Sequence, residues 1–376
     1  MQEILTSSAM PIPLLMDEER ERATLSRLIQ YYGLESEAER LNALFDLISR
    51  ESLPGFYRSH ARHFSAINGN GMPIQFSVSL GTAMPSLRYL GEVGSPGMSI
   101  PERLQLTTFR LREILRLLDL QSASTGINHL FELLFPKNPD EVKCWTCGIW
   151  IAFRAVPGHP IGLRLYLNQR WGSILERYYR IGHVFASLGR EHSLVDWCRV
   201  AEHVSTCAIP FGVAFYIVPE GVSRFKVYFA AHGVNWKYLE NLLACLGFCH
   251  RLNYLKRLIT LCDLDQPGIP PWAIMPSLEF SDHPGCSVGL KLDVSCNHLH
   301  TSDAQMDTLI MNYLQEFSFD PEEYQSVLGL LSLGTLNENK VERIQYCGIG
   351  FQEDGSIRFN IYFCPGSVSE GEGSAL

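Results

Sequence analysis

The chain has 376 residues, of which 46% are hydrophobic, so it is long and apolar enough to bury a large core. Its 31 basic and 40 acidic residues give a formal net charge of −9, which excludes a global basic field for nucleic acid but not a local basic site. No apolar run approaches the roughly 20 residues of a membrane span, and the first residues lack the basic and apolar regions of a secretory signal. We therefore expect a globular protein that binds neither nucleic acid nor a membrane.

The eleven cysteines are scattered through apolar patterns, which is typical of buried free thiols in a reducing compartment. This usage predicts a cytoplasmic protein. Cys144 and Cys147 form a single CxxC motif, with no second CxxC or HxxxH at the spacing of a zinc site. We therefore expect no metal site.

Two amphipathic helices are predicted near the start of the chain, over 17–33 and 36–50. Gly33 is a typical stop for the first helix. Ser36 and Glu39 have the spacing of a capping box at the start of the second.

The period of the apolar residues then changes from 3.6 to 2, which predicts a strand pair over 74–81 and 85–93. A capping signature with proline in the first turn opens a helix over about 99–120. A further helix is predicted over about 126–135. The first repeating unit is thus a strand pair followed by a helix pair.

This order recurs along the chain. The later predicted strand pairs are 144–156 with 162–168, 207–219 with 223–231, 277–281 with 286–296, and 343–351 with 356–363. The predicted helix pairs between them are 172–188 with 191–204, 235–248 with 252–262, and 302–316 with 321–332.

Short hairpin turns make each strand pair antiparallel, and every helix pair must return on the same side of the sheet. The predicted fold is therefore α+β, a ten-stranded antiparallel β-barrel with a solvent-filled lumen, surrounded by α-helices. We expect one domain over 1–366, with N-terminal helices in 1–70 and five units in 71–366. Residues 367–376 are expected to form a flexible tail.

The second strand of each pair alternates apolar residues with a polar set of cations, tyrosines and amides. Because the apolar face must pack against the helices, the polar face of a closed barrel lines the lumen. The predicted lumen cations are Arg88, Arg164, Arg224, Lys226 and Lys291. Glu92, Glu279 and Asp293 can neutralise part of this charge, and the rest suits a small polyanion such as a diphosphate. A solvated sheet face is the alternative interpretation of the same alternation.

Tyr166, Tyr228 and Tyr362 lie on the same predicted face. Their electron-rich rings can stabilise and shield a carbocation. Together with the cations they predict a site that holds a diphosphate beside a developing positive charge.

The succession of units resembles the ABBA fold of aromatic prenyltransferases, and the local motifs resemble the dimethylallyltryptophan synthase branch, particularly its bacterial members. The resemblance covers about 70–366. The family's motifs G-x-P-x-E-[YF]-S, V-R-[FY], K-x-Y and R-x-K-x-Y are similar to GMPIQFS from Gly71, Leu87-Arg88-Tyr89, Arg164-Leu165-Tyr166 and Arg224-Phe225-Lys226-Val227-Tyr228. Lys291-Leu292-Asp293 and Asn360-Ile361-Tyr362 occupy the equivalent places in the fourth and fifth units.

The resemblance implies transfer of a dimethylallyl group from dimethylallyl diphosphate to an electron-rich arene by electrophilic aromatic substitution in secondary metabolism. It implies that the five cations bind the diphosphate, that the three tyrosines shield the allylic cation, and that no cofactor or metal is required. The acceptor contacts that we expect are Gln75, Asn168 and Asn360.

Glu92 and Asp293 are the lumen-side candidates for the base that removes the ring proton, and a structural ion pair is the alternative role of each. The chain has no DDxxD motif, and Asp263 with Asp265 is the nearest approach to one. This pattern favours ionisation of the donor by protein cations over an aspartate-bound magnesium cluster.

The chain departs from the family at several positions. Gln75 stands where the indole enzymes have Glu, and an amide can accept an N–H hydrogen bond but not a proton. The family's lysine in the first strand of the second unit falls near Val156, and Asn168 and Asp293 replace aromatic shield residues. These changes leave the acceptor open among tryptophan, a carbazole, a phenol and a modified indole.

Two other functions fit the same pattern. One is a non-catalytic barrel that binds an anionic small molecule, which predicts no diphosphate release with any arene. The other is an enzyme for a different phosphorylated substrate, which predicts diphosphate binding without transfer of a five-carbon unit. The sequence does not indicate the ring position attacked, the prenyl chain length or the oligomeric state.

Overall fold

The structure is a computed structural model. It describes residues 17–59, 65–82, 84–142, 148–205, 208–231, 236–262, 273–281, 288–296, 303–332, 344–352 and 355–365. The CxxC motif of Cys144 and Cys147, the pair Asp263 and Asp265, and the tail 367–376 lie outside the described residues.

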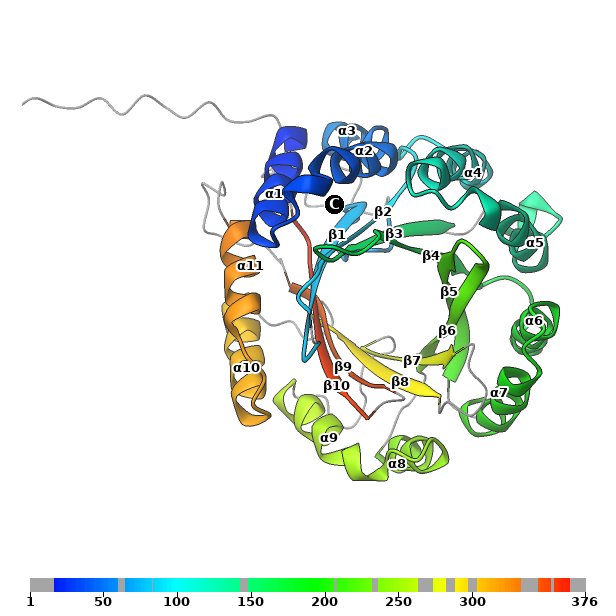
Figure 1. The fold of residues 1–376 in the computed structure, drawn as a ribbon. Coiled ribbons are helices and arrows are strands. Elements are labelled where there is room, and N and C mark those ends of the chain that lie inside the picture. Colours follow the sequence, from blue (N-terminus) through cyan, green and yellow to red (C-terminus); the bar gives the residue numbers. More distant parts are fainter. Residues whose placement is uncertain are drawn as a thin grey trace, which may run out of the picture.

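Ten antiparallel strands close into one barrel (Figure 1). Each strand pairs with its neighbours in chain order, and β1 closes the barrel by pairing with β10. The strands are β1 (Ile74–Leu80), β2 (Leu87–Glu92), β3 (Ile149–Ala155), β4 (Gly162–Asn168), β5 (Ala208–Val218), β6 (Gly221–Ala231), β7 (Ile274–Ser281), β8 (Gly289–Ser295), β9 (Ile344–Phe351) and β10 (Ile357–Phe363). The predicted fold class is confirmed.

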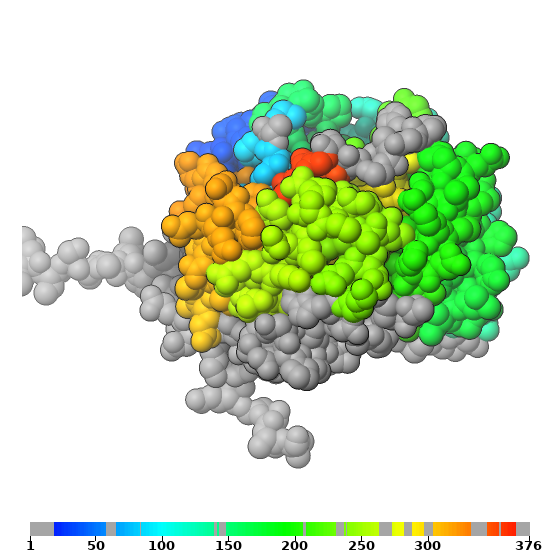
Figure 2. Space-filling model, turned by 90° about the horizontal axis from the view of Figure 1, so that it is seen from below, coloured from blue at the N-terminus to red at the C-terminus, as the bar shows by residue number. Residues whose placement is uncertain are grey.

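The α-helices form a ring outside the barrel (Figure 1). They are α1 (Asp17–Tyr31), α2 (Ala38–Ser49), α3 (Ser52–Ser59), α4 (Ile100–Leu117), α5 (Ser124–Leu134), α6 (Ile174–Ser187), α7 (Glu191–Val204), α8 (Trp236–Cys245), α9 (Leu252–Leu261), α10 (Asp303–Glu316) and α11 (Glu322–Ser332). Figure 2 shows part of this outer layer, with α8 and α9 between the α10–α11 pair and the α6–α7 pair. None of the described helices is long and apolar enough to cross a membrane.

The local signals at the helix starts had different outcomes. The capping box that opens α4 is confirmed, since Ser99 and Glu102 each accept a backbone hydrogen bond from the other. The one predicted from Ser36 and Glu39 is wrong. A 3-10 turn (Glu35–Glu37) places Ser36 inside the turn, and α2 begins at Ala38 without a side-chain cap. Helix α3 was not predicted, because proline and glycine within its eight residues weaken the helical signal.

The outward-facing side chains of the strands form one core with the helices. Phe225 is fully buried, and its ring meets that of Phe185 on α6 edge to face at 4.7 Å between centroids. Tyr89 is also buried, and its hydroxyl donates a 3.0 Å hydrogen bond to the carbonyl oxygen of Leu41 on α2. Each such side chain contributes about 1.5–3 kcal/mol by burial, which fixes the apolar face outward and turns the polar face into the lumen.

Candidate active site

The lumen contains two adjoining cavities that share Leu90, Tyr166, Tyr228 and Tyr362 in their walls. The first has a volume of about 200 Å³, and we call it the cation compartment. Its basic lining residues are Arg88, Arg154, Arg164, Arg224, Lys226, Lys291 and Arg358. The second has a volume of about 380 Å³, and we call it the aromatic compartment. Its lining includes Ile67, Trp150, Phe211, Met275 and Tyr346, with the amides Gln75 and Asn168.

All five cations predicted from the sequence line the cation compartment, and two further arginines join them. Arg358 begins the polar alternation of β10. Arg154 lies on β3 directly opposite Arg88 on β2, so it supplies a cation from the first strand of the second unit. Val156, where the family's lysine was expected, lies beyond the end of β3 and is buried. The signal that identifies Arg154 is therefore its register with Arg88 rather than its place in a motif.

Glu279 on β7 is the one carboxylate among the described residues that line the cation compartment. It forms ion pairs with Lys226 at 2.7 Å and with Arg224 at 3.1 Å. Burial alone would raise the pKa of Glu279, but Lys226, Arg164 and Arg224 lower it to about 2. Glu279 is therefore an anion at any physiological pH.

The compartment nevertheless keeps a surplus of positive charge. Burial lowers the pKa of Arg88 to about 10, and repulsion from Arg154 and Arg164 acts in the same direction. Burial also lowers the pKa of Lys226, against the attraction of Glu279. The hydroxyl of Ser79 lines the same compartment, is buried, and has no hydrogen-bond partner among the described residues. Crowded cations and an unsatisfied buried donor are the features of a site built for an anion.

One hydroxyl orders two of these arginines. Ser86 Oγ accepts a hydrogen bond from Arg88 Nε at 3.0 Å and another from Arg154 Nε at 3.3 Å. The two like charges are thereby held side by side. Because their ε N–H groups are occupied, the terminal guanidinium nitrogens are the donors that each can direct toward a ligand.

Two glycines of β9 leave the lumen wall opposite β8 without side chains. Gly348 pairs with Asp293, and Gly350 pairs with Lys291. A Cβ atom on Gly348 would come within 2.3 Å of Asp293 Oδ1 and 2.4 Å of the Leu292 carbonyl oxygen, so only glycine fits there. Asp293 forms an ion pair with Lys291 at 2.5 Å and lines the aromatic compartment.

Three tyrosines form a belt between the compartments. Tyr166 accepts a hydrogen bond from Arg164 Nη1 at 2.8 Å, and Tyr362 accepts one from Lys291 Nζ. The rings of Tyr166 and Tyr228 lie 5.9 Å apart between centroids. Burial opposes ionisation of Tyr166, but the charges of Arg164, Lys226 and Lys291 and the hydrogen bond from Arg164 together lower its pKa. Burial raises the pKa of Tyr228 and Tyr362. The predicted shield residues therefore meet at the junction of the two cavities.

The amide of Gln75 has a fixed orientation in the aromatic compartment. Asn68 Nδ2 donates to the carbonyl oxygens of Met72 and Ile74, which leaves Asn68 Oδ1 as an acceptor. Gln75 Nε2 donates to that oxygen at 3.0 Å and to the Ile67 carbonyl oxygen at 3.1 Å. Because its nitrogen is held by Asn68 and Ile67, Gln75 presents its side-chain carbonyl oxygen as the hydrogen-bond acceptor for a ligand.

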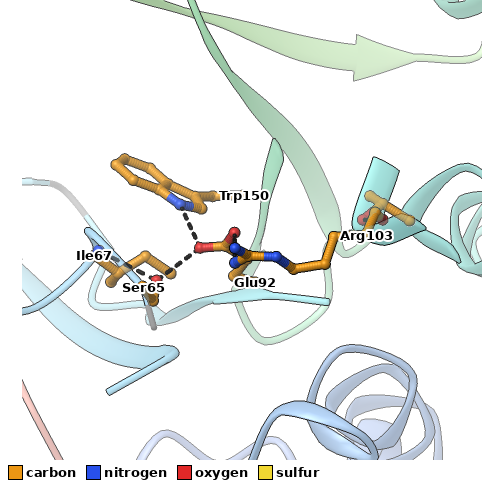
Figure 3. Close-up of polar contacts among 6 residues, drawn as sticks. Ser65, Ile67, Glu92, Arg103 and Trp150 are labelled. Atoms are coloured by element: carbon orange, nitrogen blue, oxygen red, sulfur yellow. Dashed lines mark hydrogen bonds and ion pairs between the residues drawn. The ribbon is translucent and has the colours of Figure 1, made fainter. Parts of the chain in front are cut away.

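The remaining predicted residues fall in different places. Asn168 lines the aromatic compartment, as an acceptor contact would, whereas Asn360 lines the cation compartment. Glu92 lines neither cavity among the residues described. Glu92 is 1% exposed, and its carboxylate is enclosed by Ser65, Arg103 and Trp150 (Figure 3).

Trp150 was not predicted from the sequence, and it lines the aromatic compartment beside Tyr166, to which it is paired across β3 and β4. In the described part of the chain, no group of three or more His, Cys, Asp or Glu side chains is arranged to hold a metal ion.

No protein-family model matches the chain, and no curated protein sequence matches it significantly. Solved structures do match. The 5-dimethylallyltryptophan synthase from Streptomyces coelicolor is 19% identical, with a TM-score of 0.73 over 92% of this chain and 96% of that one. The 6-dimethylallyltryptophan synthase from Micromonospora olivasterospora, solved in complex with DMASPP and Trp, is 14% identical, with a TM-score of 0.78 over 92% and 96%.

AnaPT from Neosartorya fischeri is 16% identical, with a TM-score of 0.69 over 96% of this chain and 97% of that one. These similarities extend over nearly the whole of every chain compared. The ten-stranded barrel, its outer ring of helices and this coverage lead to one conclusion: the chain has the ABBA barrel fold of the dimethylallyltryptophan synthases.

Proposed function

We propose that this protein is an aromatic prenyltransferase, which transfers a dimethylallyl group from dimethylallyl diphosphate to an electron-rich arene such as an indole or a carbazole. The observation that carries the proposal is the junction of a seven-cation compartment with an aromatic compartment across a belt of three tyrosines. The fold supports it, since the similar structures include PriB in a ternary complex with L-tryptophan and dimethylallyl thiolodiphosphate.

The cation compartment is the proposed site of the diphosphate. When the bond between the allylic carbon and the diphosphate oxygen breaks, the electron pair goes to that oxygen and negative charge develops there. Arg88, Arg164 and Lys226 are held in place before the reaction, so they stabilise this charge without reorganising. Asn360 lines the same compartment and is proposed to contact the donor.

The tyrosine belt is the proposed site of the allylic cation. Tyr166, Tyr228 and Tyr362 border both cavities, so a five-carbon chain that leaves the diphosphate passes between their rings. Aromatic faces attract a cation, and the three rings cover part of its surface from water. The cation is therefore directed toward the aromatic compartment.

The aromatic compartment is the proposed site of the acceptor. A ring carbon of the arene attacks the allylic cation, a carbon–carbon bond forms, and the ring then loses a proton. Gln75 is proposed to accept a hydrogen bond from an N–H of the acceptor, and Asn168 to contact it. Asp293, which lines this cavity, is the proposed base.

The reaction is proposed to need no cofactor and to take place in the cytoplasm. Buried free thiols at Cys262, Cys296, Cys347 and Cys364 support a reducing compartment.

Chromatography with mass detection tests the proposal. The purified protein is incubated with dimethylallyl diphosphate and a panel of indoles, carbazoles and phenols, and both diphosphate and products are measured. Equal amounts of diphosphate and a singly prenylated arene are expected with at least one acceptor. Diphosphate binding without any prenylated product would contradict the proposal and favour a barrel that only binds the anion.

Turnover is expected to survive chelation, because seven protein cations line the proposed diphosphate site and can supply the charge that magnesium would otherwise provide. The measurement is the initial rate in excess EDTA. Complete loss of turnover, with recovery on adding magnesium, would show that the protein cations do not suffice.

Gln75→Glu is expected to change the choice of acceptor more than the affinity for the donor. Residue 75 faces the aromatic compartment, and a carboxylate there accepts an N–H hydrogen bond about twice as strongly as an amide does. The KM for acceptors with an N–H group should fall relative to the KM for phenols. Michaelis constants for several acceptors and for the donor decide the matter, and a changed donor KM with an unchanged acceptor profile would count against this placement.

A further inference from the structure

Glu92 is a buried carboxylate whose oxygens are both occupied (Figure 3). Its Oε2 atom accepts hydrogen bonds from Ser65 Oγ at 2.7 Å and from Trp150 Nε1 at 3.1 Å. Its Oε1 atom forms an ion pair with Arg103 Nη1 of α4 at 3.0 Å. Burial raises the pKa of Glu92 to about 7 against these contacts, a value that by itself would suit a general base. Geometry decides otherwise, because a base must reach the proton that it removes and Glu92 is not part of the described lining of either cavity.

Two of the three partners of Glu92, Trp150 and Ser65, lead to the wall of the aromatic compartment. Trp150 lines that compartment, and its N–H points toward Glu92 (Figure 3). Ser65 Oγ also accepts a hydrogen bond from the Ile67 N–H at 3.3 Å, and the Ile67 carbonyl oxygen accepts one from Gln75. One carboxylate thus anchors an aromatic wall and the segment that fixes the Gln75 amide.

We infer that Glu92 is a positioning residue, which orients Trp150 and the Ser65–Ile67 segment and so sets the shape of the acceptor site. Arg103 favours the charged form of this buried carboxyl group and holds its Oε1 atom in place. This inference rests on the proposed function, since it takes the aromatic compartment to be the acceptor site. It assigns removal of the ring proton to a group other than Glu92.

A mutant cycle tests this role through the acceptor. Glu92→Ala and Trp150→Phe are each expected to raise the acceptor KM about ten-fold, the size expected for losing a hydrogen bond to a charged group, with the donor KM unchanged. Glu92→Gln is expected to recover most of that loss, because the amide oxygen of the new side chain still accepts the hydrogen bond from Trp150 Nε1. The combined variant should lose no more than the single variant with the larger loss, because Trp150→Phe removes a hydrogen bond that Glu92→Ala has already broken.

Two results would overturn the inference. The first is a fall in kcat of more than about a hundred-fold in Glu92→Gln, with both substrates saturating and both KM values unchanged, which is the behaviour of a lost base. The second is an increase in acceptor KM in the combined variant that equals the product of the increases in the two single variants. If Glu92→Ala does not fold, Trp150→Phe and Glu92→Gln still test the role separately. A raised acceptor KM with an unchanged donor KM is expected in Trp150→Phe, and a near-native kcat is expected in Glu92→Gln; an unchanged acceptor KM in Trp150→Phe would overturn the inference. Glu21→Gln is the matched control, since Glu21 is a fully buried carboxylate on α1 that accepts a hydrogen bond from Tyr57.

Arene affinity without the donor separates this inference from the proposed function. If the wild type transfers no prenyl group to any arene, the proposed function has failed. The dissociation constants of the same variants for a carbazole or an indole, followed by tryptophan fluorescence, still decide the positioning role. An about ten-fold weaker affinity in Glu92→Ala that Glu92→Gln restores is expected, and equal affinities in all variants would overturn it.

Discussion

Lys226→Ala is expected to reduce prenyl transfer about 30- to 1000-fold, equivalent to about 2–4 kcal/mol of transition-state stabilisation, while the barrel stays folded. Lys226 is 6% exposed, lies in the cation compartment, and shares its strand face with Arg224. Because Arg224 still pairs with Glu279 in the variant, no carboxylate is left without a partner. Steady-state turnover and thermal melting measure the two effects.

Lys237→Ala is the matched control, since Lys237 is an exposed lysine on α8, outside the barrel. An exposed charge contributes less than about 1 kcal/mol, so this variant should keep near-native turnover. Near-native turnover in Lys226→Ala as well would mean that Lys226 does not act on the donor, and the compartment would then need another role.

Glu279→Gln is expected to destabilise the unliganded protein by about 3–5 kcal/mol, because it leaves Lys226 and the neighbouring arginines without their carboxylate. Inorganic diphosphate should restore much of that loss, since a ligand that binds the native state alone stabilises it. Thermal melting with and without diphosphate measures both effects. A variant as stable as the wild type, with no larger response to diphosphate, would contradict the proposed charge balance.

The same residue gives a pH dependence with a definite sign. The pKa of Glu279 is lowered to about 2 in the folded protein, below its ordinary value of 4.5, so its contribution is complete above pH 4.5 and is lost as the pH falls toward 2. Glu279→Gln should lack this part of the acid transition. Glu240→Gln is the control, because Glu240 pairs with Lys256 at 3.3 Å on the surface, and it should follow the wild-type profile.

The barrel could be predicted because its strands alternate so regularly. Phe225, Val227 and Phe229 face the helices and Lys226 faces the lumen, as a period of two requires. Five such pairs with helices returning on one side leave closure as the simplest solution. Most helix and strand boundaries followed from the same periodicity, although α3 was not predicted and β3 begins at Ile149 rather than at residue 144.

The parts that were missed depend on register and on the ends of strands. Arg154 appears in the sequence as an interruption of an apolar run, and only its pairing with Arg88 shows that it belongs to the cation compartment. Glu92 lies on the same side of the β2 alternation as Arg88, as a lumen residue would. It is the last residue of β2, however, where Arg103 and Trp150 enclose it. Asn360 lies on the lumen face of β10 as predicted, but the stagger of the strands places it in the cation compartment rather than in the aromatic compartment.

A crystal structure with dimethylallyl thiolodiphosphate and a carbazole or indole tests the central claim most directly. The account predicts the diphosphate among Arg88, Arg164 and Lys226, with the five-carbon chain between Tyr166 and Tyr228 and the arene in the aromatic compartment. An allylic carbon close to a ring carbon of the arene would complete the expected arrangement. A diphosphate bound outside the cation compartment, or an arene on the same side of the tyrosine belt as the diphosphate, would contradict it.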